Sequence, residues 1–143
     1  MATHKRSLET AAPPDVIWSI WSDTSTWPAW NPDVRSISLD GPFANGTIGT
    51  MTTGAGTHSI HLENVSAGRS FELVTSPMPA TVFRFHCEVD PSASGSVISQ
   101  SVEIRGALGT LLGGQMGKRV ASSFEPILAG LAQEAERVGN GTP

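Results

Sequence analysis

The stretch "LGGQMGKRVASSFEPILAGLAQEA", residues 112–135, decides the fold, because apolar side chains recur along it every three or four positions. This spacing is typical of an α-helix with one apolar face. It predicts a long C-terminal helix of about 110–138, bent at Pro126 but continuing beyond it. The apolar positions are Leu108, Leu111, Leu112, Met116, Val120, Phe124, Ile127, Leu128, Leu131 and Ala135.

Such a helix must bury its apolar face against another surface, and the preceding residues supply strands. Between residues 34 and 104, clusters of Gly, Pro, Asp and Ser recur about every ten residues and separate six candidate strands, several with alternating apolar positions. A further strand is expected over 3–11. A short helix should begin at Pro13-Pro14-Asp15 and end near Ser22, and Asp23 or Thr24 can cap a second helical turn.

Together these elements predict an α+β fold, in which a curled antiparallel sheet of about seven strands surrounds the C-terminal helix. Two short helices follow the first strand. The chain of 143 residues contains no internal repeat and no linker. We therefore expect a single ligand-binding domain over residues 1–143, with a core of about 3–138.

Composition excludes several classes of protein. The net charge is −4 with no basic cluster, so nucleic acid is not an expected partner. The sequence contains no run of about 18 apolar residues, so no integral membrane contact is expected. The first ten residues lack a signal peptide, and the single Cys87 cannot form an internal disulfide, so a cytoplasmic protein is expected. No zinc or nucleotide motif is present, which predicts no metal and no cofactor. The sequence does not fix the oligomeric state.

The segment "WSDTSTWPAWNPDV", residues 21–34, contains three of the four tryptophans and two prolines within fourteen positions. Two interpretations remain open. Trp21, Trp27 and Trp30 can be ordinary core residues. Alternatively, Trp27 and Trp30 can form a wall that is apolar inside and hydrated outside, held in place by the neighbouring prolines.

Three stretches resemble the polyketide cyclase/dehydrase branch of the START-like (SRPBCC) superfamily. They are "APPDVIWSIWSDTSTWPAWNPDV", "LDGPFANGT" and "VDPSASGSVISQSVEIRGALGTLLGG". The resemblance covers about residues 3–138 and implies the helix-grip fold, with a cavity between sheet and helix. Members of this family include aromatase/cyclases, dehydratases and carriers. In such a protein the segment with Trp27 and Trp30 would close one end of the curled sheet.

Strand parity predicts which side chains face that cavity, because residues i and i+2 of a strand share a face. Ile98 and Ile104 should face the helix, and the polar or reactive side chains in phase with the apolar face are His58, Thr75, Cys87 and Gln100. The predicted ligand-binding residues are Trp27, Trp30, Phe71, Leu73, Phe83, Phe85, Cys87, Val102, Met116, Gly117 and Val120.

His58 and Gln100 are the candidate catalytic residues. An imidazole titrates near neutrality and can act as an acid or base, although His58 can equally be a histidine at a strand end that reaches solvent. The Gln100 amide needs partners among apolar neighbours, either within the protein or on a ligand. Cys87 has no basic neighbour in phase and is expected to be an inert small apolar residue.

Gly117, with Gly113 and Gly114, is unusual within a helix, where glycine costs up to about 1 kcal/mol relative to alanine. Close packing against the sheet, space for a ligand, or a late helix start can each explain these glycines. On the opposite face of the sheet, charge pairing between strands is a sufficient role for His61, Glu72, Arg84, His86, Glu88 and Glu103.

Three functions are compatible with the sequence. The first is binding of a small hydrophobic molecule, aromatic, polyketide-like or lipid, with promotion of its cyclisation or dehydration without a cofactor. The second is a non-catalytic carrier or sensor of a hydrophobic metabolite. The third is a protein-interaction module that uses the tryptophan-bearing end. An apolar cavity with few polar groups favours the first two, and no acid–base pair in the sequence decides between them.

Overall fold

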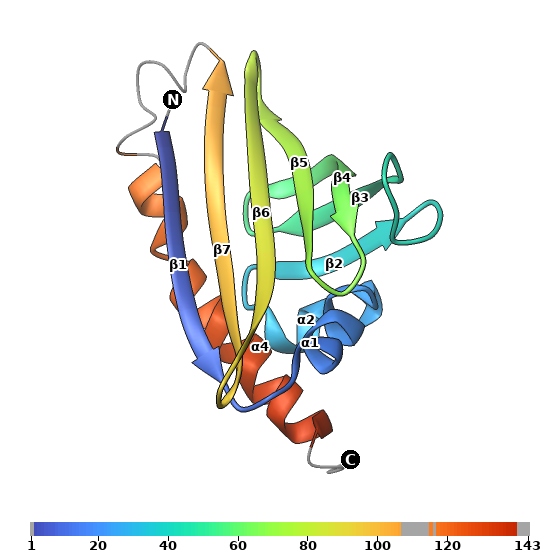
Figure 1. Cartoon of the computed structure of the whole chain (residues 1–143). Helices are drawn as coiled ribbons and strands as arrows, with labels where there is room; N and C mark the ends of the chain where they lie inside the picture. Colours follow the sequence, from blue (N-terminus) through green and yellow to red (C-terminus); the bar gives the residue numbers. More distant parts are fainter. Residues whose placement is uncertain (1, 107–114, 116, 140–143) are drawn as a thin grey trace.

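The computed structural model describes residues 2–106, 115 and 117–139 (Figure 1). Seven strands form one antiparallel sheet in the order β1-β7-β6-β5-β4-β3-β2, which confirms the predicted curled sheet. The strands are β1 (Ala2–Thr10), β2 (Val34–Leu39), β3 (Ile48–Thr53), β4 (Gly56–Ser66), β5 (Ser70–Met78), β6 (Thr81–Ser92) and β7 (Gly95–Gly106).

Two short helices connect β1 to β2, as predicted. Helix α1 spans Pro14–Trp21, and Pro14 occupies its first turn, where a missing N–H costs nothing. Asp23 then caps a 3₁₀ turn, η1 (Thr24–Thr26), because its carboxylate accepts a hydrogen bond from the Ser25 backbone N–H at 3.2 Å. Helix α2 (Trp27–Trp30) follows directly. The predicted cap at Asp23 is therefore confirmed.

The C-terminal helix differs from the prediction in its continuity. Residues 117–121 are helical, Ser122 and Ser123 form a turn, and α4 spans Phe124–Gly139. Pro126 lies in the first turn of α4 and has no N–H for the Ser122 carbonyl, so the chain starts a new helix here instead of bending one. The helix continues beyond Pro126, as predicted, but it is interrupted at Ser122 and Ser123, where no break was predicted. The predicted start near residue 110 lies outside the described residues.

The helices cover the concave face of the sheet. Figure 1 shows α4 crossing behind β1 and β7, while α1 and α2 lie at the lower end of the sheet. The predicted apolar face of α4 is confirmed, since its buried residues include Phe124, Leu128, Leu131 and Ala135. At one end, Thr10 Oγ1 donates a hydrogen bond of 2.8 Å to Glu136, which fixes β1 against α4. None of the helices in the described part of the chain has both the length and the apolar character to cross a membrane.

The tryptophan segment packs around one phenylalanine. The Phe71 ring lies 5.4 Å from Trp21 and 6.1 Å from Trp27, measured between centroids, and also contacts Trp18. Trp21, Trp27 and Trp30 are all buried. The indole N–H of Trp27 donates to the Trp21 carbonyl at 2.9 Å, so its polar atom is satisfied inside the core. The tryptophans are thus core residues, and Trp27 also reaches a cavity.

Candidate functional site

A cavity of about 140 Å³ lies between the concave face of the sheet and the C-terminal helical residues. Three sides enclose it: β5, β6 and β7 form its floor, the helical residues cover it, and the segment around α2 closes one end. The residues that line it are Trp27, Asn31, Asp33, Val34, Met51, Thr53, Phe71, Leu73, Phe85, Cys87, Gln100, Val120, Ser123, Phe124 and Ile127.

Strand register explains why the floor is apolar with one polar end. Cys87 on β6 lies opposite Gln100 of β7 on one side and opposite Phe71 of β5 on the other. In the next row, Phe85 lies opposite Leu73. Residues opposite each other in an antiparallel pair share a face, so these five side chains point to the same side of the sheet. Gln100 is the polar end of this floor.

Gln100 is also the cavity residue whose polar group is most available. Ser123 Oγ donates to the Val120 carbonyl, Thr53 Oγ1 accepts from the Ala55 N–H, and Asn31 Oδ1 accepts from the Asp33 N–H. By contrast, the side-chain amide of Gln100 makes no hydrogen bond with another described residue. An amide in an apolar wall is stabilised by a partner, and none of the described residues supplies one to Gln100.

The chemistry available inside the cavity is limited. Burial raises the pKa of the Cys87 thiol to about 12, so the thiol stays protonated and is a poor nucleophile near neutral pH. Asp33 is the carboxylate among the lining residues and is exposed at the rim. Within residues 2–106, 115 and 117–139, no three His, Cys, Asp or Glu side chains gather closely enough to hold a metal ion.

The cavity reaches solvent near the start of β2. Asp33 and Thr53 line the cavity and also border a surface hollow, whose other residues are Pro32, Arg35, Gly54 and Ala55. The two spaces therefore share a rim, formed by the chain after α2 and by the turn between β3 and β4. Asp33 is exposed, so this rim is a place where the cavity lining meets the surface.

Seven of the predicted site residues line the cavity, and the others lie elsewhere. Trp30, Phe83 and Val102 are buried but do not line it. His58 shares the concave face with Met51, its partner across β3 and β4, yet it borders a separate hollow on β3–β5. Met116 lies outside the described residues. The lining set is Trp27, Phe71, Leu73, Phe85, Cys87, Gln100 and Val120.

Gly117 does not open space for a ligand. A Cβ atom placed on this residue would collide with the imidazole ring of His4 from β1. The expectation that a ligand occupies the volume beneath Gly117 is therefore wrong, because a side chain of the protein fills it. Of the explanations for this glycine, close packing between helix and sheet is the one that the contact supports.

Several lining residues were not predicted from the sequence. Met51 has a signal in hindsight, because it lies opposite His58 on the concave face. Phe124 and Ile127 belong to the apolar stripe of the helix. Helical spacing does not tell which residues of such a stripe line a cavity and which pack in the core. Asn31, Asp33, Val34 and Thr53 line the cavity because β2 and β3 curl back toward the helix, and no local pattern encodes that curvature.

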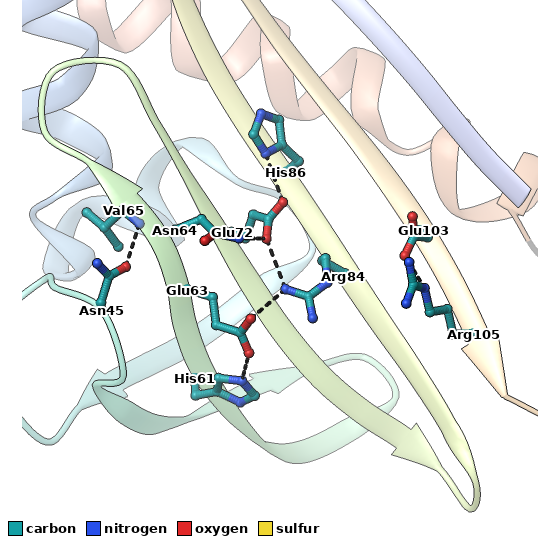
Figure 2. Close-up of polar contacts among 10 residues, drawn as sticks. All are labelled: Asn45, His61, Glu63, Asn64, Val65, Glu72, Arg84, His86, Glu103 and Arg105. Carbon is teal, nitrogen blue, oxygen red and sulfur yellow. Dashed lines mark hydrogen bonds and ion pairs between the residues drawn. The ribbon is translucent and has the colours of Figure 1, made fainter. Parts of the chain in front are cut away.

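The charged residues gather on the opposite, convex face of the sheet, as predicted from parity (Figure 2). Arg84 on β6 donates to Glu63 at 2.7 Å and to Glu72 at 2.9 Å. His86 lies 3.2 Å from Glu72, and His61 contacts Glu63. In the same view Glu103 and Arg105 pair on β7. These contacts support the structural role predicted for this face.

Hydrogen bonds across this cluster change the acidity of its carboxyl groups. The pKa of Glu63 is lowered from its ordinary value of 4.5 by hydrogen bonds from Arg84 and then His61. Burial acts to raise the pKa of Glu72, but hydrogen bonds from Asn64, Arg84 and His86 outweigh it and lower the pKa. The folded state therefore holds both carboxylates in their charged form more strongly than the unfolded chain does.

This cluster predicts a loss of stability in acid that depends on Arg84. Because the folded pKa values are lowered, the stabilisation is fully present above about pH 4.5 and is lost as the pH falls through the lower folded values. In Arg84→Met, urea unfolding at pH 7, 5 and 3 should show a smaller decrease in unfolding free energy toward pH 3 than in the wild type. Arg119→Met, at an exposed position, should retain the wild-type pH dependence, and an equal decrease in all three proteins would contradict the assignment.

Comparison with known proteins agrees with this fold. Residues 1–136 match the family model described as "Polyketide cyclase / dehydrase and lipid transport". No curated protein sequence matches the chain significantly.

Two solved structures illustrate the shared fold. The protein XoxI from Bacillus cereus is 19% identical with a TM-score of 0.76, and the match covers 96% of this chain and 98% of that one. The truncated norcoclaurine synthase from Thalictrum flavum is 14% identical with a TM-score of 0.69, covering 92% and 91% of the two chains. At these identities the likeness establishes the fold alone. Because the family model spans residues 1–136 of the 143, the chain belongs to the polyketide cyclase/dehydrase and lipid transport family.

Proposed function

We propose that this protein binds a small hydrophobic molecule in the cavity between the sheet and the C-terminal helix. The observation that carries the proposal is the cavity itself, whose walls are mainly apolar and aromatic side chains with few polar groups, the side-chain amides of Gln100 and Asn31 among them. Ligand sites in proteins typically combine an apolar wall with a few placed polar groups. Membership in a family described by cyclase, dehydrase and lipid-transport activities supports the same class of ligand.

Binding without acid–base catalysis is the role that the lining residues favour. The Cys87 thiol is protonated at neutral pH, and His58 lies outside the cavity lining. A second role, promotion of cyclisation or dehydration, rests on the Gln100 amide and on the confinement of a flexible substrate, which can accelerate a reaction through orientation alone. Carriage needs only the cavity, and we take it as the primary function.

The test is to fill the cavity from the helical side. In Val120→Trp, the indole should occupy the space and weaken binding of any apolar ligand at least tenfold, because its volume is comparable to that of the cavity. Toluene, naphthalene and decanoic acid form a suitable panel, with dissociation constants measured by ligand-observed NMR. Native mass spectrometry of the purified protein provides an independent search for a bound molecule.

Two control variants separate loss of the cavity from general damage. Val138→Trp introduces the same side chain at an exposed position of α4 and should leave binding unchanged. His58→Ala should also leave binding unchanged, since its side chain does not line the cavity. If neither a member of this panel nor phenol binds the wild type, or if Val120→Trp binds as well as Val138→Trp, the proposed function is wrong.

A further inference from the structure

The size of the cavity restricts the ligand to about one ring. Its volume is about 140 Å³. An engineered apolar protein cavity of about 150 Å³ accommodates a single benzene molecule, whereas sites for drug-sized ligands begin near 300 Å³. A fused polycyclic molecule or a long acyl chain exceeds this volume and would have to project through the rim, whereas a single substituted ring fits inside.

Aromatic side chains surround the space on several sides. Phe71 on the floor lies 6.1 Å from Trp27 at the closed end, and Phe85 on the floor lies 6.2 Å from Phe124 above it, measured between ring centroids. Rings at such separations favour tilted and edge-to-face neighbours. The walls therefore suit an aromatic ring placed over Cys87, between Phe71 and Phe85.

The Gln100 amide adds one polar requirement. It stands at the β7 end of the row Gln100–Cys87–Phe71 and has no hydrogen-bond partner among the described residues. A purely apolar ligand would bury this amide without a partner, which is unfavourable. A hydroxyl or carbonyl substituent on the ring would bond to it, since an amide both donates and accepts.

The charges near this end favour a neutral ligand. Arg6 on β1 lies opposite Gln100 in the same row, but it does not line the cavity, and its Nε lies 3.8 Å from a carboxylate oxygen of the exposed Glu125. The Cys87 thiol is uncharged at neutral pH, and the carboxylate of Asp33 stands at the rim. An anionic ligand would be repelled by the carboxylate of Asp33 at the rim, and it would meet no Lys or Arg side chain among the described lining residues.

We infer that the ligand of the proposed function is a neutral molecule with a single aromatic ring and one hydroxyl or carbonyl group. The ring lies over Cys87, and the polar group bonds to the amide of Gln100. Gln100 is thus the residue that selects among small aromatic molecules. This inference rests on the proposed function and narrows its ligand to one chemical class.

The first test compares ligands on the wild-type protein. Phenol, 2-naphthol and benzoate are titrated at pH 7 by NMR. Phenol should bind at least tenfold more tightly than 2-naphthol, which is too large, and at least tenfold more tightly than benzoate, which is charged. Equal or tighter binding of either 2-naphthol or benzoate would overturn the inference.

The second test assigns the polar contact to Gln100. In Gln100→Met, a side chain of similar length loses the amide, so the affinity for phenol relative to toluene should fall about tenfold, the scale of one hydrogen bond and one relieved unpaired amide. Gln133→Met, exposed on α4, should keep the wild-type ratio. An unchanged ratio in Gln100→Met would exclude Gln100 as the contact.

A measurement on the wild type covers the case in which Gln100→Met does not fold. The side-chain NH₂ resonances of Gln100 should shift on addition of phenol and much less on addition of toluene. An equal shift of these resonances with phenol and with toluene would show that the polar group of phenol does not bond to Gln100. If naphthalene or decanoic acid binds while phenol and toluene do not, the inference fails and the proposed function stands. If no compound in either panel binds, both fail.

Discussion

Replacing Phe71 with alanine is expected to lower the free energy of unfolding by about 3–5 kcal/mol, the usual cost of removing a fully buried phenylalanine. Phe71 is 1% exposed, and its ring contacts those of Trp21, Trp27 and Phe43. Its loss would remove the ring on which the tryptophan segment packs and would leave a cavity beside the existing one. Urea unfolding followed by tryptophan fluorescence measures the effect.

Phe43→Ala is the matched control for this prediction. Phe43 lies 5.0 Å from Phe71 but is only partly buried, so its removal should cost less than half as much. Similar losses for the two variants would mean that Phe71 is not the centre of the cluster. Because Phe71 also lines the cavity, Phe71→Ala should admit 2-naphthol better than the wild type does, provided that the variant is assayed below its unfolding temperature.

The elements of the fold could be predicted because each has a local signal. The turn residues between 34 and 104 separate strands whose alternation fixes which side chains face the helix, and the structure confirms this pairing of faces. Pro14 and Asp23 mark helical starts through the geometry of proline and the capping carboxylate. The charged cluster around Arg84 followed from parity as well, because a side chain excluded from the concave face must lie on the convex one.

The position of the cavity could not be predicted in the same way. Parity places Phe83, Phe85 and Val102 on one face but does not tell which of them the helix covers. The structure leaves Phe85 at the cavity and buries Val102 completely, because the helical residues cross the sheet at a particular angle. Asn31 and Asp33 reach the cavity through the curl of β2 and β3, which depends on contacts distant in sequence.

The surroundings of Gly117 could not be predicted from the sequence either. The sequence indicated that a glycine in a helix needs a reason, yet it did not identify His4, 113 positions earlier, as the side chain that fills the space. The break at Ser122 and Ser123 has a local cause in Pro126, but the apolar stripe continues across it and conceals it. Both outcomes depend on how closely β1 and the helical residues approach each other.

Gly130→Ala is expected to destabilise the protein by about 1–3 kcal/mol, the scale of an overpacked contact. Helix propensity alone predicts the opposite sign, because alanine within a helix is favoured over glycine by about 1 kcal/mol. Gly130 lies in the middle of α4, where a Cβ atom would collide with the backbone carbonyl of Trp30. A backbone carbonyl cannot rotate away as a side chain can, and Trp30 ends the helix that holds Trp27 against the cavity. The strain should therefore exceed the gain in propensity.

Gly139→Ala separates these two effects within the same helix. A Cβ atom at Gly139, the last residue of α4, would meet no atom within 4 Å, so alanine there should leave the unfolding free energy unchanged or slightly raised. Urea unfolding of both variants at pH 7 gives the comparison. If Gly130→Ala is as stable as Gly139→Ala, α4 does not approach α2 closely enough to require glycine. The closure of the cavity at its tryptophan end would then depend on the indole side chains alone, and not on contact between the two helix backbones.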